Sequence, residues 1–270
     1  MQIQLFGALQ IRHGGRTLRG GDLGGAKPRA ILELLLLARG RTVSKDRLAD
    51  ALWGDRPPRN VAAALEHHVC VLRQRLCDDA ELSHRIIVTE PGAYRLDTTL
   101  VSTDIDEFDH LLRDAETSDD DRRRCLLSRA VDLAPDDLLD DAPYAPWTEH
   151  DRDRYREKVA RAHLWLARDA MAGHHFVQSL RHAEDALRVA PYSEAAFRMI
   201  MVADHGLGHA DLARRAYARC RDVLADHLGA VPSRDTEALA AEIAAGSPAA
   251  HLVTMLLGGT MPRPLAVAAA

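Results

Sequence analysis

The residues best placed to do chemistry lie in a short stretch, residues 59–76, whose outer face has hydrogen-bonding side chains at helical spacing. One apolar stripe has the spacing i, i+4, i+7, i+11 and consists of Leu65, Val69, Leu72 and Leu76. At about 100° per residue, the opposite side is polar and short-chained; it holds Asn60, Ala63, His67, Val71 and Gln74, with Arg59 and Cys70 on its flank. A helix fixed by one stripe and offering such a face suits the major groove of DNA. A solvated amphipathic helix is the alternative, and the flanking sequence has to distinguish the two.

Other reactive residue types lack the patterns that catalysis or metal binding requires. The segment GGDLGGAKPR has glycines and Lys27, but not the GK[ST] ending that holds phosphate and magnesium. Four potential zinc ligands in one expected helix point in different directions and cannot converge on one ion; they are His67, His68, Cys70 and Cys77. The group His174, His175 and His182 forms no HExxH pattern. We therefore expect no enzyme, no metal site and no cofactor.

Charge divides the 270 residues into two parts. Residues 1–97 hold 15 Lys and Arg against 11 Asp and Glu, whereas residues 98–270 hold 20 against 29. Only the first part is expected to meet a polyanion, and its basic residues must be clustered. The four cysteines form no CxxC pair, and neither a long apolar run nor a basic-then-apolar N-terminus is present. This pattern favours a protein of the reducing cytoplasm.

The elements around residues 59–76 have a recognisable order. Apolar alternation on either side of Gly7 predicts short strands at residues 3–5 and 9–11. A helix follows from Pro28 to Gly40, with a buried leucine-rich centre, and Ser44 is placed to cap a second helix. After the third helix, residues 85–89 and 93–96 predict a hairpin around Glu90-Pro91-Gly92. Strands, three helices and a hairpin make a winged helix-turn-helix with an extra N-terminal sheet.

From Asp104 onward the pattern is almost wholly helical. Gly173 and Gly208, 35 positions apart, each separate two helices, and Ala-rich interiors permit close helix approach. This period predicts tetratricopeptide-like pairs, which usually hold other proteins rather than perform chemistry. The acidic run 136–141 is expected to be a solvated linker or, less simply, an activation contact, and the sequence after Gly246 a flexible tail.

Several motifs together resemble a known family. The stretches GGAKPRAILELLLL, VSKDRLADALWGDRPP, HHVCVLRQRL and AYRL are similar to the OmpR-type DNA-binding domain. The later stretches YAPW, PYSEAAFRMIMVADHGLGHADLARRAY and LADHLGAVPS resemble a bacterial transcriptional activation domain. The combination resembles the Streptomyces antibiotic regulatory protein family of transcriptional activators, over residues 3–243.

The resemblance makes residues 59–76 the recognition helix. Arg73 matches the arginine of the family's V-x-x-LR pattern, which implies a phosphate contact. We assign His67 and Gln74 to base-edge hydrogen bonds, because imidazole and amide groups both donate and accept. A solvated surface role is the alternative for each. The other candidates on this helix are Arg59, Asn60, Ala63, Val71 and Arg75.

The resemblance also makes residues 85–96 the wing, with Arg85, Tyr94 and Arg95 as its candidate contacts. Lys27 and Arg29, like Arg75, are further candidates for the DNA backbone, because basic side chains near a groove neutralise phosphates and release counterions.

Three positions depart from what the family usually carries. Val71 stands where arginine is common, Glu90 where the wing often has a basic residue, and Ala93 where glycine precedes the tyrosine. A carboxylate near phosphates is repelled, while Val71 could touch a thymine methyl group. These changes leave the expected fold intact and bear on target sequence and affinity.

The sequence thus predicts an α+β winged helix-turn-helix domain over residues 1–97, an all-α tetratricopeptide-like domain over 98–246, and a tail over 247–270. The resemblance implies a sequence-specific transcriptional activator that binds direct repeats in double-stranded DNA as a homodimer and recruits RNA polymerase through its sigma factor. A secondary-metabolite gene cluster would be its target. A protein-interaction adaptor that has lost DNA binding is the alternative.

Overall fold

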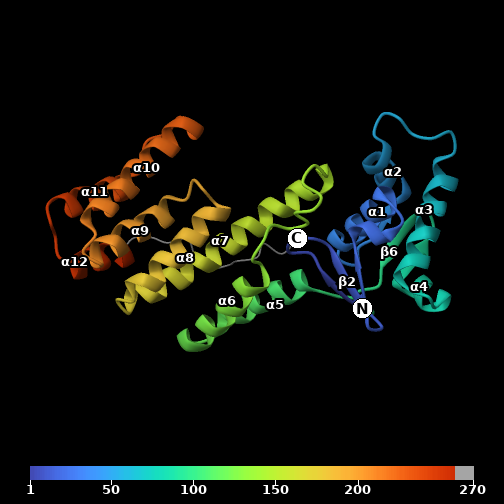
Figure 1. Cartoon of the computed structure of the whole chain (residues 1–270), viewed down its shortest axis with the longest axis horizontal. Helices are drawn as coiled ribbons and strands as arrows, with labels where there is room; N and C mark the ends of the chain where they lie inside the picture. The colour runs from blue at the N-terminus through green and yellow to red at the C-terminus, as the bar shows by residue number, and fades with distance from the viewer. Residues whose placement is uncertain (259–270) are drawn as a thin grey trace. The chain divides into compact units, whose positions relative to one another are not determined.

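A computed structural model describes residues 1–258, which fall into two compact units (Figure 1). Among the described residues, the first unit comprises 1–109 and 133–154, and the second comprises 110–132 and 155–258. Two helices, α5 (Asp104–Thr117) and α7 (Glu149–Ala172), are divided between the units, and the last residue of α6 (Asp120–Leu133) also lies in the first unit. Within the described residues, no helix is both long and apolar enough to cross a membrane.

The first unit begins with a four-stranded sheet in the order β3-β2-β1-β7. Its strands are β1 (Gln2–Gln4), β2 (Gln10–His13), β3 (Arg16–Arg19) and β7 (Ser102–Thr103). Ile3 pairs antiparallel with Ile11, and both side chains are buried, as strand alternation requires. Gly7 has φ +82°, a conformation that favours glycine, at the bend that the sequence indicated.

The three helices that the sequence predicted follow, together with a short 3₁₀ turn and a fourth helix that it did not predict. They are the short 3₁₀ turn η1 (Gly20–Leu23), α1 (Ala26–Leu37), α2 (Lys45–Trp53), α3 (Val61–Leu76) and α4 (Ala80–Ile86). Ser44 Oγ accepts a hydrogen bond from Arg47 N at 3.1 Å, which confirms the expected cap of α2. Residues 30–37 of α1 are all buried, because other elements of the unit surround this helix.

The wing is a three-stranded sheet in the order β4-β6-β5, formed by β4 (Val43–Ser44), β5 (Ile87–Glu90) and β6 (Ala93–Leu96). The sequence predicted the two long strands but not the short β4, which pairs with β6 through Val43 and Tyr94. Helix α4 was also missed. Arg85 therefore belongs to the last turn of α4 and not to a wing strand.

The acidic run 136–141 is not a solvated linker, and that prediction is wrong. Leu138 and Leu139 are fully buried, and Leu139 N donates to Leu5 O at 2.8 Å. Gly7 N donates to Asp137 O at 2.8 Å, so the run lies along the bend after β1 like a further strand. The apolar leucines between the aspartates drive this packing, and the carboxylates occupy the outer edge.

Arg152, near the start of α7, forms hydrogen bonds to the same segment. Its side chain is 7% exposed. The guanidinium donates to the carbonyl oxygens of Leu138 (2.7 Å), Leu139 (2.5 Å), Ala142 (2.8 Å) and Pro143 (3.1 Å). One cation thus donates to four carbonyls of this loop, of which Leu139 O and Ala142 O also accept from the backbone N–H groups of Ala142 and Ala145.

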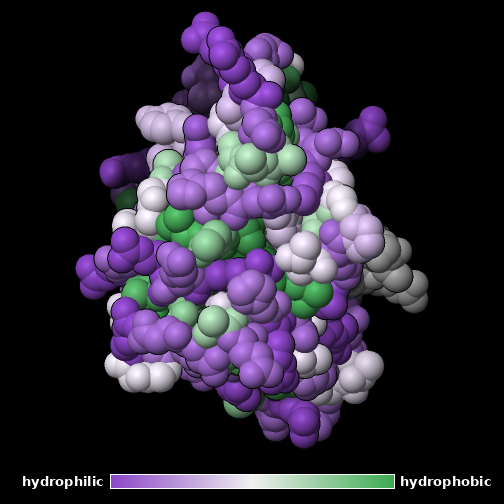
Figure 2. Space-filling model, turned by 90° about the vertical axis from the view of Figure 1, so that its right-hand side faces the viewer, coloured by the Kyte–Doolittle hydropathy of each residue, from purple (hydrophilic) through white to green (hydrophobic). Residues whose placement is uncertain are grey.

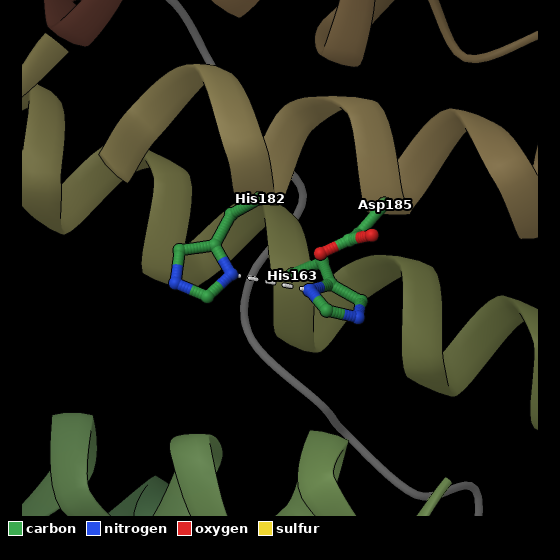
Figure 3. Close-up of side chains that lie close together, drawn as sticks. All are labelled: His163, His182 and Asp185. Carbon is green, nitrogen blue, oxygen red and sulfur yellow. Dashed lines mark hydrogen bonds between the residues drawn. The ribbon is translucent and has the colours of Figure 1, made fainter. Parts of the chain in front are cut away.

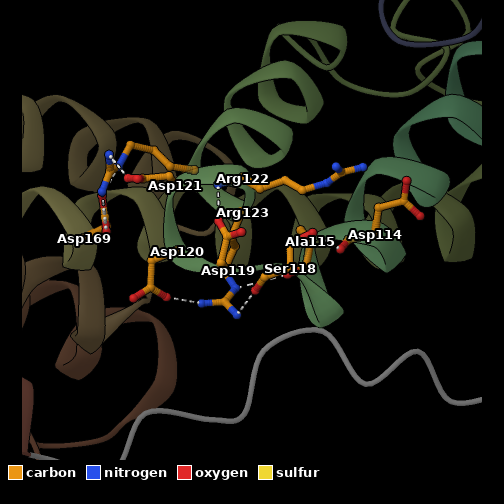
Figure 4. A network of polar contacts seen from close by, with 10 residues as sticks. Asp114, Ala115, Ser118, Asp119, Asp120, Asp121, Arg122, Arg123 and Asp169 are labelled. Carbon is orange, nitrogen blue, oxygen red and sulfur yellow. Dashed lines mark hydrogen bonds and ion pairs between the residues drawn. The ribbon is translucent and has the colours of Figure 1, made fainter.

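In the second unit, residues 110–117 of α5 and helix α6 (Asp120–Leu133) form a hairpin whose turn is held by charged groups (Figure 4). Asp119 caps α6 by accepting from Arg122 N at 2.9 Å. Arg123 spans the turn, donating to Ala115 O (3.1 Å), Ser118 O (2.6 Å) and the Asp120 carboxylate (2.6 Å). An ion pair between Arg124 and Asp169 joins α6 to α7.

The rest of the second unit consists of helical pairs: residues 155–172 of α7 with α8 (Phe176–Val189), α9 (Glu194–Gly206) with α10 (Ala210–Leu228), and α11 (Arg234–Ala244) with α12 (Ala249–Gly258). The expected all-helical, tetratricopeptide-like arrangement is confirmed. Small residues permit close approach. Ala183 and Ala186 are fully buried, and a Cβ on Gly206 would lie 2.6 Å from the Phe176 ring.

The predicted tail is wrong for residues 249–258. They form α12, whose Leu252, Val253 and Leu256 join the core around α9. Arg168 Nη2 also donates to Leu257 O at 2.7 Å. The apolar residues of this segment have helical spacing. The Gly246-Ser247-Pro248 segment therefore separates α11 from a further helix and does not mark the end of the folded chain. Residues 259–270 of the predicted tail lie outside the described residues.

Arg152 gives a test of the corrected domain organisation. We expect Arg152→Ala to lower the free energy of unfolding of the first unit by about 2–4 kcal/mol, because all four carbonyls lose their side-chain donor and only Leu139 O and Ala142 O keep a backbone donor. Arg152→Lys should recover part of this loss, since an ammonium can satisfy up to three acceptors.

Urea denaturation of the full chain measures the effect. The control is Arg56→Ala, an exposed arginine of the α2–α3 loop, which should change stability by no more than about 0.5 kcal/mol. A loss below about 1 kcal/mol for Arg152→Ala would mean that residues 138–143 do not depend on this side chain.

Candidate DNA-binding surface

Helix α3 begins at Val61, after a break at Gly54 and Pro57-Pro58. Asn60 is its N-cap residue: Asn60 Oδ1 accepts a hydrogen bond from Ala63 N at 3.0 Å. The sequence placed Arg59 and Asn60 on the helix. The structure instead puts Arg59 before the first turn, where its side chain is exposed, and commits the Asn60 oxygen to the cap.

The buried stripe of α3 is confirmed. Leu65, Val69, Leu72 and Leu76 are the buried residues of this helix, each no more than 4% exposed. The opposite face is exposed and contains Ala63, Glu66, His67, Cys70 and Gln74. Glu66 pairs with Lys45 of α2 at 2.9 Å, so the one carboxylate of this face is balanced. His67 and Gln74 thus lie on the surface that the sequence assigned to them.

Val71 does not belong to this outer face. It is half-buried, and a Cβ added to Gly24 would lie only 2.4 Å from Val71 Cγ1. Gly24 itself has φ +88°, so both conformation and space require glycine there. The loop between η1 and α1 covers this edge of α3, and Val71 packs on it. Its assignment as a groove-facing residue is wrong.

Arg73 connects the helix to the wing. Its Nη2 donates to Ile87 O at 2.5 Å and to Thr89 Oγ1 at 2.8 Å, both in β5. Partial burial lowers the pKa of the Arg73 guanidinium, although arginine remains charged at neutral pH. The structure therefore gives Arg73 a positioning role between α3 and β5 in place of the predicted phosphate contact. Arg75, two positions further along α3, is exposed.

Two other predicted DNA contacts are engaged inside the fold. Arg29 is 17% exposed and pairs with Glu33 at 2.6 Å and Asp141 at 2.7 Å. Tyr94 is 2% exposed, and Lys45 Nζ lies 5.6 Å from its ring centroid. Both assignments are wrong, because side-chain type alone does not reveal a buried partner.

Lys27, the third candidate near α1, remains half-exposed. Its Nζ lies 5.3 Å from the centroid of the Trp53 ring, a cation–π distance, and its charge helps to lower the pKa of His68, which is mainly lowered by burial. This contact fixes the direction of the ammonium group at the junction of α1, α2 and α3.

In the wing, two neighbouring side chains form hydrogen bonds to the negatively charged Glu90 carboxylate. Its carboxylate accepts from Thr42 Oγ1 at 2.8 Å and from Arg95 Nε at 3.0 Å, and these bonds lower the pKa of Glu90. The Arg95 charge is thereby shared with Glu90. Ala93 is 5% exposed and lies opposite Ser44 in the sheet. The exposed tip of the wing is the pair Pro91 and Gly92.

A polar hollow of about 690 Å³ borders the C-terminal half of α3. Gln74 and Arg75 line it from the helix, and Arg16, Gly24 and Gly25 line it from the sheet and the start of α1. Arg16 forms an exposed ion pair with Asp78 at 2.7 Å. The sequence gave no signal for Arg16, because only the folded chain brings β3 beside α3.

Figure 2 shows the face of the molecule on which α3 and α4 lie. It is mostly hydrophilic, with smaller apolar patches near its middle. The predicted site residues that stay exposed, apart from the cap residue Asn60, are Arg59, Ala63, His67, Gln74, Arg75 and Arg85, and Lys27 stays partly exposed. They offer hydrogen-bonding groups and cations to a ligand, and no arrangement of paired carboxylates or nucleophiles for catalysis is found among the described residues.

Family models match both parts of the chain. A model described as the bacterial transcriptional activator domain matches residues 103–244, and one described as the C-terminal part of transcriptional regulatory proteins matches residues 24–96. Among solved structures, EmbR of Mycobacterium tuberculosis, in complex with a low affinity phosphopeptide, is similar with a TM-score of 0.75. The identity is 25%, and the match covers 95% of this chain and 69% of that chain.

Curated relatives include the transcriptional regulatory protein MoaR1 of Mycobacterium tuberculosis, 27% identical over 96% of this chain and 84% of that protein. The regulatory protein DnrI of Streptomyces peucetius is 27% identical over 86% of this chain and 88% of that protein. The regulatory protein AfsR of Streptomyces coelicolor is 28% identical, but the chain spans only 25% of its length. With a winged helix ahead of an activator domain, and with these relatives, the chain belongs to the Streptomyces antibiotic regulatory protein family of transcriptional regulators.

Proposed function

We propose that this regulator binds direct repeats in promoter DNA through α3 and recruits RNA polymerase, acting by binding and not by catalysis. The observation that supports it best is the exposed face of α3, where His67 and Gln74 stand opposite a fully buried leucine stripe. A helix held so firmly on one side can be inserted into the major groove without loss of its own packing. The site of action is the cytoplasm, where bacterial DNA is found.

The names of the relatives support a more specific proposal about which genes are regulated. DnrI and AfsR are Streptomyces regulators, and the family is named for antibiotic regulation, so we assign the chain to the control of a secondary-metabolite gene cluster. Two subunits placed head to tail would read repeats about 10–11 base pairs apart, because both recognition helices must meet the same side of the duplex. The helical second unit would supply the surface for sigma factor and polymerase.

The adaptor alternative depended on Val71, Glu90 and a modest positive charge. Val71 packs against Gly24, and the Glu90 carboxylate is bonded to Arg95 and Thr42. Neither side chain therefore presents an unfavourable group to DNA, which supports the activator proposal. A selection of random duplexes that enriches no motif would favour the adaptor.

Affinity for the promoter beside the gene should depend strongly on salt. With four or five phosphate contacts per complex, affinity should fall by about 150- to 500-fold between 50 and 200 mM salt, because added salt opposes the counterion release that accompanies each contact. Fluorescence polarisation of a labelled promoter fragment measures this slope. Nearly constant affinity over this range would contradict a phosphate-contacting surface.

Base preference should depend on His67 and Gln74. We expect His67→Ala and Gln74→Ala each to relax discrimination at a different base pair by about 1–3 kcal/mol, with a smaller effect on non-specific DNA. Competition among promoter fragments with single-base changes measures this. His150→Ala, an exposed histidine of α7, serves as the matched control. A uniform loss over all sequences would show that the two side chains do not read bases.

Substitutions of Arg73 and Arg75 should have different effects, one on protein stability and the other on the salt dependence of DNA binding. Arg73→Ala should lower the free energy of unfolding by about 1–3 kcal/mol, because it leaves the Ile87 carbonyl without its donor. Arg75→Ala should leave stability within about 0.5 kcal/mol and reduce the salt slope by about one. Urea denaturation and polarisation of the same two proteins test both statements, and equal stabilities would contradict the positioning role of Arg73.

A further inference from the structure

Two histidines and a carboxylate meet between α7 and α8, far in sequence from the DNA-binding surface. His163 comes from α7, and His182 and Asp185 come from α8, one turn apart. The His163 and His182 Nδ1 atoms lie 3.3 Å apart, and one ligand atom from each of the three residues lies within 4.8 Å of the other two. Figure 3 shows the two rings facing each other, with Asp185 beside His163.

Burial favours the uncharged form of both imidazoles. His163 is 6% exposed, and burial lowers its pKa to about 4. Burial also lowers the pKa of His182. The uncharged ring is the form whose free nitrogen lone pair binds a metal ion.

The spacing of the nitrogens matches a tetrahedral ion. Two nitrogen ligands at about 2.0–2.1 Å from zinc, separated by a tetrahedral angle, lie about 3.3–3.4 Å from each other. The observed 3.3 Å has the same value. A direct hydrogen bond between the rings is the competing arrangement, in which one ring donates and the other accepts.

The charges around the pair are balanced. Asp185 and Asp132 contribute carboxylates, while Arg181 and Arg188 contribute guanidinium groups. Asp185 Oδ1 lies 3.2 Å from Arg188 Nη2, which leaves the second carboxylate oxygen for another partner. A divalent ion would add its full charge of two to this balanced set, and the Asp185 carboxylate, as a direct ligand, would be the negative group nearest to it.

We propose that His163, His182 and Asp185 bind Zn²⁺ as a cross-link between α7 and α8, with water as the fourth ligand. Two imidazoles and one carboxylate favour zinc over magnesium or calcium, which prefer oxygen ligands. No sequence pattern pointed to this site, since 19 positions separate its histidines and only the packing of α7 against α8 brings them together. The expectation that the chain has no metal site is therefore replaced by this proposal.

The ion should stabilise the helical unit. Zinc that binds the folded chain and not the unfolded chain raises its stability, so the first helical pair would become more resistant to heat when zinc is present. This effect does not depend on DNA, and it can be measured whether or not the proposed DNA site is correct.

The test uses the full chain, stripped with a chelator and dialysed, with ZnCl₂ alone as the probe. Calorimetry with a competing chelator should give one tight site per chain, and the melting temperature should rise by several degrees at saturating zinc. Cobalt substitution should produce the visible absorption of a tetrahedral site. Asp185→Asn and His182→Ala should each weaken zinc by more than about tenfold, since even outer-sphere changes cost that much.

His110→Ala is the matched control, because His110 and Asp114 form an exposed pair on α5 without a third ligand. It should bind zinc as the unchanged chain does. Circular dichroism establishes that each variant is folded; Asp185→Asn keeps the side-chain shape and carries the test if His182→Ala does not fold. Zinc affinity unchanged in Asp185→Asn, or no zinc site in the unchanged chain, would overturn the proposal and leave the histidines as a hydrogen-bonded pair.

Discussion

The Glu33 carboxylate is the group around which the DNA-binding unit is organised. It is 1% exposed in the middle of the leucine-rich helix α1, where an unpaired charge would cost several kcal/mol. Arg29 Nε and Trp147 Nε1 both donate to it, at 2.6 and 3.1 Å. Since Trp147 lies more than a hundred residues later, the carboxylate requires the segment 133–154 to be part of the unit.

This requirement extends to α3. Helix α1 is buried on all sides because α3 covers one side of it and the short 3₁₀ turn η2 (Pro146–Thr148), which carries Trp147, packs against another. Arg29, bonded to Glu33, also reaches Asp141 in the acidic run. The carboxylates of that run therefore act within the first unit, and the position of α3 depends on residues that look like a linker in the sequence.

Periodicity and capping residues predicted most of the helices, because both act over one or two turns, but α4 and α12 were missed. The stripe of α3 and the Ser44 cap are of this kind. Partners distant in sequence were not predictable. Arg29, Arg73 and Tyr94 have the right chemistry for DNA, yet each is committed to a group that folding brings to it. The histidine pair between α7 and α8 escaped notice for the same reason.

Charge then limits how such a unit can bind DNA. Its residues 1–109 and 133–154 carry 17 Lys and Arg against 22 Asp and Glu, so the unit is not a polycation. With Arg29, Arg73 and Arg95 engaged internally, few cations remain near α3, and one subunit can neutralise few phosphates. Because affinity for DNA rises steeply with the number of phosphates neutralised, a second subunit on an adjacent repeat would contribute more than any further contact within one. The internal use of these arginines is consistent with the proposed pairing on direct repeats, and weak binding of single subunits would confine activity to promoters that carry both repeats.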